Sequence, residues 1–207
     1  MNLKKLNIPC ILALLLSIAI FSPIAMAGSP TDEIKTSIDK ILATLRQTDL
    51  DNTNKREQIK TVIHERFDFK GMSRRALGKN WKKISEQDQN SFIDHFSKLL
   101  MNTYINRIEA YTDETIKYAR EKIKKKSAIV YTLIVTKSVE IPINYKMKQH
   151  SDDWRVYDVV IEEVSLIRNY RSSYQSILKK EGIEALLHEM EKKIASLQDT
   201  KQDDKPS

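Results

Sequence analysis

The residues that come nearest to a catalytic motif are His64-Glu65-Arg66-Phe67-Asp68. In the zinc-binding motif His-Glu-x-x-His, two histidines one helical turn apart hold the metal and the glutamate acts as the base. Here Asp68 stands at the position of the second histidine, and the next histidine in the chain is His95. The four histidines are far apart in sequence and match no metal-ligand spacing. We therefore expect the end of a solvated helix at this point and no metal site.

The sequence contains no other recognisable catalytic or phosphate-binding motif. It has only four glycines, no Gly-x-Ser-x-Gly elbow and no glycine-rich phosphate loop. Asp and Glu are abundant, but no spacing selects one carboxylate pair as a general acid and base. We therefore expect a protein that is not an enzyme and that holds no cofactor. A hydrolase with an unrecognised carboxylate pair stays open as the alternative.

Residues 1–27 have the pattern of a cleaved secretory signal peptide. Lys4 and Lys5 precede an apolar run over residues 8–21, which is followed by the small-residue ending Ala25-Met26-Ala27. The run is short for the ~20 residues that a membrane-spanning helix needs, so we expect export and cleavage after Ala27. The only cysteine, Cys10, is lost with this segment. The mature chain therefore has no disulfide and no thiol nucleophile.

The charge of the chain is mildly positive. The formal net charge is +7 with Lys4 and Lys5, and it falls to +5 once they are removed. The densest basic cluster in the sequence is Lys122–Lys126. We expect it to form a solvated turn between strands, and the alternative is attraction to an anionic membrane surface or to an acidic docking partner. Because the chain carries an export signal and no nucleic-acid motif, we expect no nucleic-acid partner.

Hydrophobic periodicity divides the mature chain into helices, a central sheet and further helices. Helices are expected after the capping residues Ser29, Asp68, Ser85 and Ser165, and also over residues 55–65 and 183–197. Between Glu114 and Glu163 the apolar residues alternate with a period of two, which predicts three or four antiparallel strands. The fold class is therefore α+β, with a three- to four-stranded meander sheet and about five to six helices. We expect one domain over residues 28–198 and a disordered, charged tail over residues 199–207.

Details of the strand patterns carry further expectations. Residues 128–135 are apolar or neutral at both parities, which predicts a strand covered on both faces. Pro142 suggests that the next strand lies at an edge or contains a bulge. In residues 154–161, Trp154, Val156 and Val160 are placed on one face and Tyr157, Val159 and Ile161 on the other. Twelve aromatic residues surround this small sheet, and they either fill a solid core or line a cavity.

Several ordered motifs resemble those of the MlaC family of periplasmic phospholipid-binding proteins, also called toluene-tolerance auxiliary proteins. Residues 154–158 read Trp-Arg-Val-Tyr-Asp and residues 162–167 read Glu-Glu-Val-Ser-Leu-Ile, which is similar to the family pattern W-x-V-Y-D…E-G-V-S-L-I. Further matches are Ala-Leu-Gly-Lys-Asn-Trp at 76–81, Phe92-x-x-x-Phe96 with Leu99-Leu100 and Tyr104, Asn-Tyr-Arg at 169–171, and Lys180-x-Gly182 with Leu186-Leu187. The resemblance covers residues 31–195, and Glu163 stands where the family has glycine.

The resemblance implies a soluble, monomeric periplasmic carrier that moves phospholipid between the two membranes and maintains outer-membrane lipid asymmetry. The implied partners are phospholipid, an inner-membrane ABC transporter with an MCE-domain subunit, and an outer-membrane lipoprotein–porin complex. Transient contact with a membrane surface is also expected. A third possibility, besides the carrier and the hydrolase, is an envelope interaction module with a solid core.

The pocket expected in such a carrier lies between the sheet and the helices, and its walls are inferred from the alternation of apolar residues. The expected wall residues are Met72, Leu77, Phe96, Leu100, Tyr104, Val130, Thr132, Ile141, Ile143, Tyr145, Trp154, Val156 and Leu166. Arg168 and Arg171 are expected to contact a lipid headgroup or a partner, with surface salt bridges as the alternative.

Overall fold

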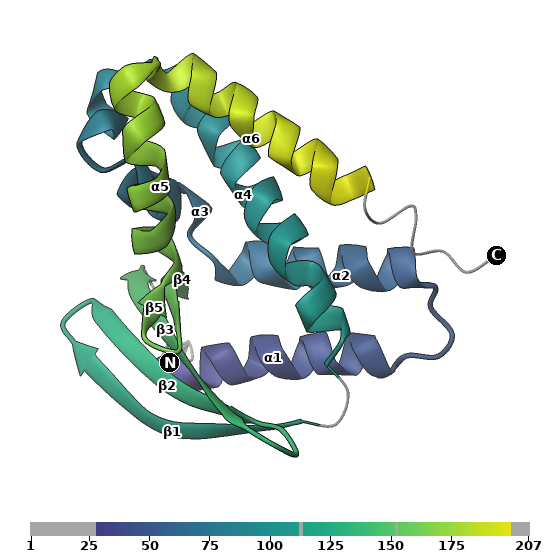
Figure 1. The fold of residues 1–207 in the computed structure, drawn as a ribbon. Coiled ribbons are helices and arrows are strands. Elements are labelled where there is room, and N and C mark those ends of the chain that lie inside the picture. The colour runs from purple at the N-terminus through teal and green to yellow at the C-terminus, as the bar shows by residue number, and fades with distance from the viewer. Residues whose placement is uncertain (1–27, 112–113, 152, 200–207) are drawn as a thin grey trace, which may run out of the picture.

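The computed structural model describes residues 28–111, 114–151 and 153–199. Helices before and after the sheet lie on one of its sides (Figure 1). The elements, in chain order, are α1 (Pro30–Arg46), α2 (Asn52–Arg66), α3 (Phe69–Leu77), the 3₁₀ helix η1 (Gly78–Lys83), α4 (Glu86–Glu109), β1 (Thr115–Lys124), β2 (Ser127–Val135), β3 (Glu140–His150), β4 (Asp153–Ile161), β5 (Val164–Ser165), α5 (Leu166–Lys180) and α6 (Gly182–Asp199). The expected α+β class is confirmed. The expected signal peptide lies outside the described residues, as does nearly all of the expected tail.

The helix starts follow the capping residues that the sequence offers. The hydroxyl oxygens of Ser29, Ser85 and Ser165 accept hydrogen bonds from backbone N–H groups three residues later, at 3.0–3.1 Å. Asp51 caps α2 in the same way, so this helix begins three residues earlier than expected. At the end of α3, Gly78 takes a φ of 57°, and the chain continues directly into η1.

The sheet is an antiparallel meander in the order β1-β2-β3-β4-β5. It has five strands rather than three or four, because a two-residue strand, Val164–Ser165, pairs with the end of β4. The solvated turn expected over Lys122–Lys126 is confirmed for Lys125 and Lys126, which are exposed in the turn that joins β1 to β2, whereas residues 122–124 form the end of β1.

Two expectations about single strands are wrong. The strand β2 is buried on one face only: Ala128, Val130 and Thr132 face the helices and are buried, while Ile129 on the other face is half-exposed. No described helix covers that outer face (Figure 1). The strand β3 is an interior strand, and Pro142 lies just past its last pair with β4, where the missing N–H removes no ladder bond.

A β-bulge in β4 changes which residues face the helices. Lys146 of β3 pairs with Asp158 while Met147 pairs with Val156, so Tyr157 is an extra residue in β4. Trp154 and Val156 therefore share the inner face with Val159 and Ile161, and not with Val160 as the simple alternation predicted. The prediction was wrong because one extra residue reverses the alternation beyond it.

The buried apolar residues form two clusters. The larger one lies among α2, α3, α4, α5 and α6, where the rings of Phe92 and Phe96 stack at 5.4 Å and the Tyr174 ring meets Phe92 edge-on at 5.8 Å. The smaller one joins Ile34 of α1 to the inner face of the sheet, around Val130 and Met147. The site described below lies between these two clusters.

Candidate functional site

A cavity of about 600 Å³ separates the two clusters. One wall is a stripe of apolar residues on α1, formed by Ile38, Ile41, Leu42 and Leu45 at helical spacing. These four side chains are only half-buried, although the helices and the sheet enclose them. Their remaining exposure is explained by the cavity that they border. The α1 stripe therefore faces the cavity, while Ile38 also packs against the cluster on the inner face of the sheet.

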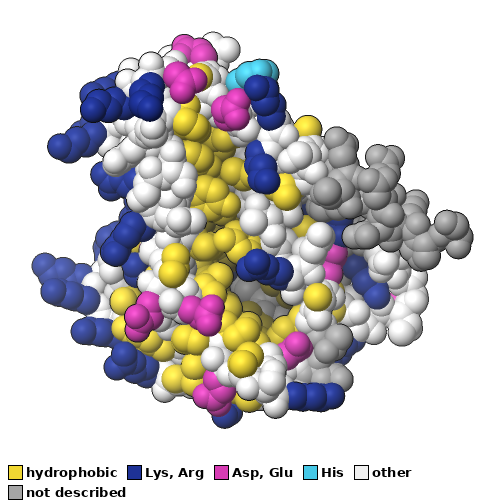
Figure 2. Space-filling view, in the orientation of Figure 1, with side chains coloured by type: hydrophobic (Ala, Val, Ile, Leu, Met, Phe, Trp, Pro, Cys, Tyr) yellow, Lys and Arg dark blue, Asp and Glu magenta, His cyan; other side chains and the backbone are white. Residues whose placement is uncertain are grey.

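The other walls come from α4 and from the inner face of the sheet. The C-terminal half of α4 contributes Leu100, Met101, Tyr104, Ile105 and Ile108. The sheet contributes the inward residues of β1 to β4, which are Ile116, Ile134, Ile141, Ile143, Tyr145, Val159 and Ile161. Figure 2 shows hydrophobic side chains in a band on this face of the molecule, around a hollow at the level of α1 and α2. The cavity is thus a long apolar space that reaches the surface.

Few charged residues border this space, and they lie at its edge. Arg107 and Glu162 are exposed and mark where the cavity meets solvent. The guanidinium of Arg107 lies 5.9 Å from the centre of the Tyr104 ring. Tyr111 donates a hydrogen bond to the backbone carbonyl of Glu114. A polar rim of this kind suits a ligand with an apolar body and a polar end.

Burial raises the pKa of the tyrosines of the wall above the ordinary value of a phenol, which is itself neutral at pH 7. It raises the pKa of Tyr145 to about 12. Burial also raises the pKa of Tyr104, against the opposing effect of the nearby Arg107 charge. Both phenols are neutral at pH 7, so neither tyrosine places a charge in the cavity wall.

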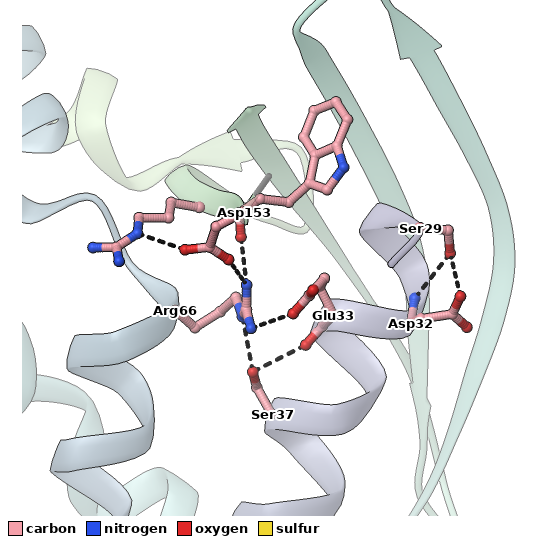
Figure 3. Close-up of polar contacts among 8 residues, drawn as sticks. Ser29, Asp32, Glu33, Ser37, Arg66 and Asp153 are labelled. Atoms are coloured by element: carbon pink, nitrogen blue, oxygen red, sulfur yellow. Dashed lines mark hydrogen bonds and ion pairs between the residues drawn. The ribbon is translucent and has the colours of Figure 1, made fainter. Parts of the chain in front are cut away.

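Arg66 borders the cavity but is held by protein groups. Figure 3 shows its guanidinium between α1 and the start of β4. It donates to Ser37 Oγ at 3.0 Å, to Asp153 Oδ1 at 2.8 Å and to the backbone oxygen of Trp154 at 2.6 Å, and it also pairs with Glu33. Its side chain is 13% exposed. These contacts tie α1, α2 and β4 together at one end of the cavity, so Arg66 positions its walls.

The residues that resembled a zinc motif have other roles. His64 is exposed, and its ring lies tilted by 45° against the Phe69 ring with the ring centres 4.8 Å apart, while Asp68 caps α3 by accepting from the Gly71 N–H at 2.7 Å. In the part of the chain that the structure describes, no three His, Cys, Asp or Glu residues are grouped to hold a metal. None of the helices described there is both long and apolar enough to cross a membrane.

The structure brings about half of the expected wall residues to the cavity. Those that line it are Met72, Leu100, Tyr104, Ile141, Ile143, Tyr145 and Leu166. The other six do not border it: Leu77 and Phe96 pack in the helical cluster, and Val130, Trp154 and Val156 pack in the sheet cluster. Thr132 is buried and donates to the Ile143 carbonyl at 2.7 Å. Arg168 and Arg171 are exposed on α5 and do not border the cavity either.

Sequence reasoning missed the α1 stripe and the pair Val159 and Ile161. The stripe was visible as an amphipathic helix, but periodicity does not say which surface the helix faces. Val159 and Ile161 were placed on the wrong face because the bulge at Tyr157 leaves no sequence signal of its own.

The carboxylate of Asp158 links the two parts of the sequence motif at residues 154–158 and 162–167, and this residue is 5% exposed. It accepts from the Ser165 hydroxyl at 2.8 Å, from the Ile167 N–H at 3.2 Å and from the Lys146 ammonium at 3.0 Å. These bonds fix the start of α5 against the sheet, next to Leu166 of the cavity wall. The intervening Glu163 has a φ of 68°, in the left-handed region that favours glycine.

Comparisons with known proteins identify the family. The sequence profile of the MlaC protein family matches residues 35–192. The chain belongs to the MlaC family. One MlaC relative, the intermembrane phospholipid transport system binding protein of Haemophilus influenzae, is 24% identical over 123 residues. That match spans 56% of this chain and 58% of the relative, which is less than two thirds of its length.

The fold is shared with a solved phospholipid-binding protein. A phospholipid-binding protein from Ralstonia solanacearum, whose structure was determined in complex with a phospholipid, superposes with a TM-score of 0.74 at 24% identity. The match covers 80% of this MlaC-family chain and 97% of the other chain. The α+β arrangement of helices on one side of a meander sheet is therefore shared between them.

Proposed function

We propose that this chain is a soluble periplasmic phospholipid carrier whose cavity holds the acyl tails. The observation that supports it most is the apolar cavity of about 600 Å³ between α1, α4 and the sheet. A two-chain lipid has on the order of 28 methylenes at ~0.8 kcal/mol each, so exposing both tails to water costs roughly 20 kcal/mol. A carrier must cover those tails, and an uncharged wall with a polar rim does so while the headgroup stays hydrated.

The finer parts of the proposal rest on family membership and on the sequence. Residues 1–27 are removed after Ala27, and residues 28–198 form one monomeric carrier domain without enzymatic activity. The carrier exchanges lipid with an inner-membrane ABC transporter that has an MCE-domain subunit, and with an outer-membrane lipoprotein–porin complex. This exchange maintains the lipid asymmetry of the outer membrane. The Haemophilus influenzae relative is the binding protein of an intermembrane phospholipid transport system, which supports this role.

A lipid-transfer assay with a matched pair of variants tests the proposal. Ile143 and Asn144 are neighbours in β3, but Ile143 lines the cavity and Asn144 lies on the opposite face of the sheet. In Ile143→Glu the carboxylate faces the tails, whereas in Asn144→Glu it faces away from them. We expect transfer of a fluorescent phospholipid between donor and acceptor vesicles to be lost in Ile143→Glu and kept in Asn144→Glu, with circular dichroism showing that both variants are folded.

The same assay separates the alternatives. Mass spectrometry of the transferred lipid should recover it intact, whereas a hydrolase would release fatty acid or a lysolipid. No transfer and no lipid uptake by the well-folded wild-type protein would contradict the carrier proposal.

A further inference from the structure

The packed elements α3, η1 and α5 carry an unusual concentration of positive charge. Residues 69–83 contain six Lys or Arg residues and residues 166–180 contain four, and neither segment contains a single Asp or Glu. Residues 28–207 have a formal net charge of +5, so the rest of this mature chain has a formal net charge of −5. The excess positive charge of the mature chain is therefore carried by these three packed elements, although they come from two segments far apart in sequence.

No acidic side chain in the part of the chain that the structure describes forms an ion pair with these ten cations. Among the ion pairs of the described residues, none includes a side chain of α3, η1 or α5. Nine of the ten are exposed, and the half-buried Arg75 stacks on the Tyr157 ring at 4.1 Å. Figure 2 shows Lys and Arg side chains along the α5 side of the molecule. Uncompensated charge of one sign produces a field that attracts an oppositely charged partner.

This surface contains a recess of its own. Its volume is about 460 Å³, and it is lined by Arg74, Gly78, Lys79, Trp81, Lys82 and Arg171. Trp81 is 8% exposed and forms a rigid part of the wall. None of the lining residues borders the lipid cavity, and no carboxylate lines the recess.

The side chain of Arg171 lies directly against Gly78. A Cβ atom on Gly78 would lie 2.8 Å from a guanidinium nitrogen of Arg171, and Gly78 has a φ of 57°. Only glycine combines this backbone with so close an approach. The contact joins the Ala-Leu-Gly-Lys-Asn-Trp segment to the Asn-Tyr-Arg segment, which are far apart in sequence. The guanidinium of Arg171 therefore lies against the backbone of Gly78 at the recess.

We propose that this recess is a docking site for the carboxylate side chains of an acidic segment of a partner protein. A planar guanidinium binds a carboxylate through two parallel hydrogen bonds, and the surrounding lysines speed the encounter and favour acidic partners. The headgroup of lipid in the cavity is a poor candidate, because the two sites share no lining residue. A flat membrane is disfavoured because the site is recessed and because the exposed large apolar residues, Ile123, Val139 and Val164, do not line it.

The test is a titration of the full mature protein with an oligo-glutamate peptide, followed by NMR at the Gly78 N–H, the Trp81 indole N–H and the Arg171 side chain. Two variants remove the same charge from different surfaces. The recess variant combines Arg74→Gln, Lys79→Gln, Lys82→Gln and Arg171→Gln. The control variant combines Lys122→Gln, Lys124→Gln, Lys125→Gln and Lys126→Gln. The four control lysines are exposed and likewise belong to no ion pair found among the described residues.

We expect the recess variant to weaken peptide binding at least about tenfold and the control variant to weaken it less than about twofold. Arg171→Lys, which keeps the charge and loses the fork, should weaken binding measurably. Equal losses in the two Gln variants would overturn the proposal. The proposal would also be overturned if phosphatidylglycerol vesicles or inorganic phosphate bound as tightly as the peptide and if the recess variant lost that binding too. The proposal goes beyond the carrier function, since lipid retention is measured separately and either result can fail alone.

Discussion

A larger side chain that points into the cavity should leave the stability of the lipid-free protein unchanged, whereas the same change in a solid core should lower it. Ile41 of α1 lines the cavity and is half-buried, whereas Ile59 of α2 is 0% exposed in the helical cluster and does not line it. Trp and Ile have similar helix propensities, so Ile41→Trp and Ile59→Trp differ chiefly in the space available to the ring.

The expected magnitudes follow from that space. In the packed cluster, Ile59→Trp should lower the free energy of unfolding by about 1–3 kcal/mol, because the additional atoms displace their neighbours. In the cavity, Ile41→Trp should change it by less than about 0.5 kcal/mol. If the indole excludes about three methylenes of cargo at ~0.8 kcal/mol each, lipid affinity should fall by ~2.4 kcal/mol, or about fiftyfold.

Urea denaturation of the lipid-free variants, followed by circular dichroism, measures the first effect. Uptake of labelled phospholipid from vesicles measures the second. If Ile41→Trp lost as much stability as Ile59→Trp, the region would be solidly packed and the account of the cavity would be refuted.

Three further predictions concern single residues. Glu163→Gly should raise the free energy of unfolding by about 1 kcal/mol, because Glu163 has a φ of 68°, and urea denaturation would show no gain if the position were unstrained. The folded protein keeps Tyr145 neutral up to a pKa of about 12 while the unfolded chain ionises near 10, so stability should fall as the pH rises from 10 through 12. In Tyr145→Phe the fall in the free energy of unfolding between pH 10 and pH 12 should be smaller than in wild type by about 2–3 kcal/mol, as denaturation at the two pH values would measure. An equal fall in the two proteins would contradict the raised pKa of Tyr145. Arg66→Lys should lower the free energy of unfolding by about 2–3 kcal/mol, because a lysine keeps the ion pair with Glu33 but loses the hydrogen bonds to Ser37 and Trp154. Thermal denaturation that shows the same stability as wild type would contradict the role given to the Arg66 guanidinium.

The sequence was sufficient to predict the elements and their order, because caps and periodicity are local signals. Ser85 and the apolar positions of α4 specify that helix without knowledge of its neighbours. The meander could likewise be predicted from the apolar run of β2 and from the alternation of apolar and polar residues in β3. The short β5 was not, since a two-residue strand has no periodicity.

The cavity itself could be predicted only in part. Residues on the inner face of β3 were placed correctly because their alternation is uninterrupted, and Ile141, Ile143 and Tyr145 line the cavity. Val130 and Val156 also lie on the inner face of the sheet, but they pack against buried neighbours and do not line the cavity. Whether an inner-face residue packs or lines the cavity depends on the local distance between α1 and the sheet. That distance is a property of the folded chain. The basic recess was missed for a similar reason, because its cations come from two segments separated by the whole sheet.

The central claim, that the cavity holds phospholipid tails, is tested most directly by the amount of lipid bound to the protein after purification from a bacterial periplasm. Organic extraction and quantitative mass spectrometry measure this amount against protein concentration. The account predicts close to one intact phospholipid per chain in the wild-type protein and much less in Ile143→Glu. A well-folded wild-type sample that yields no stoichiometric lipid, and that takes up none from vesicles, would contradict it.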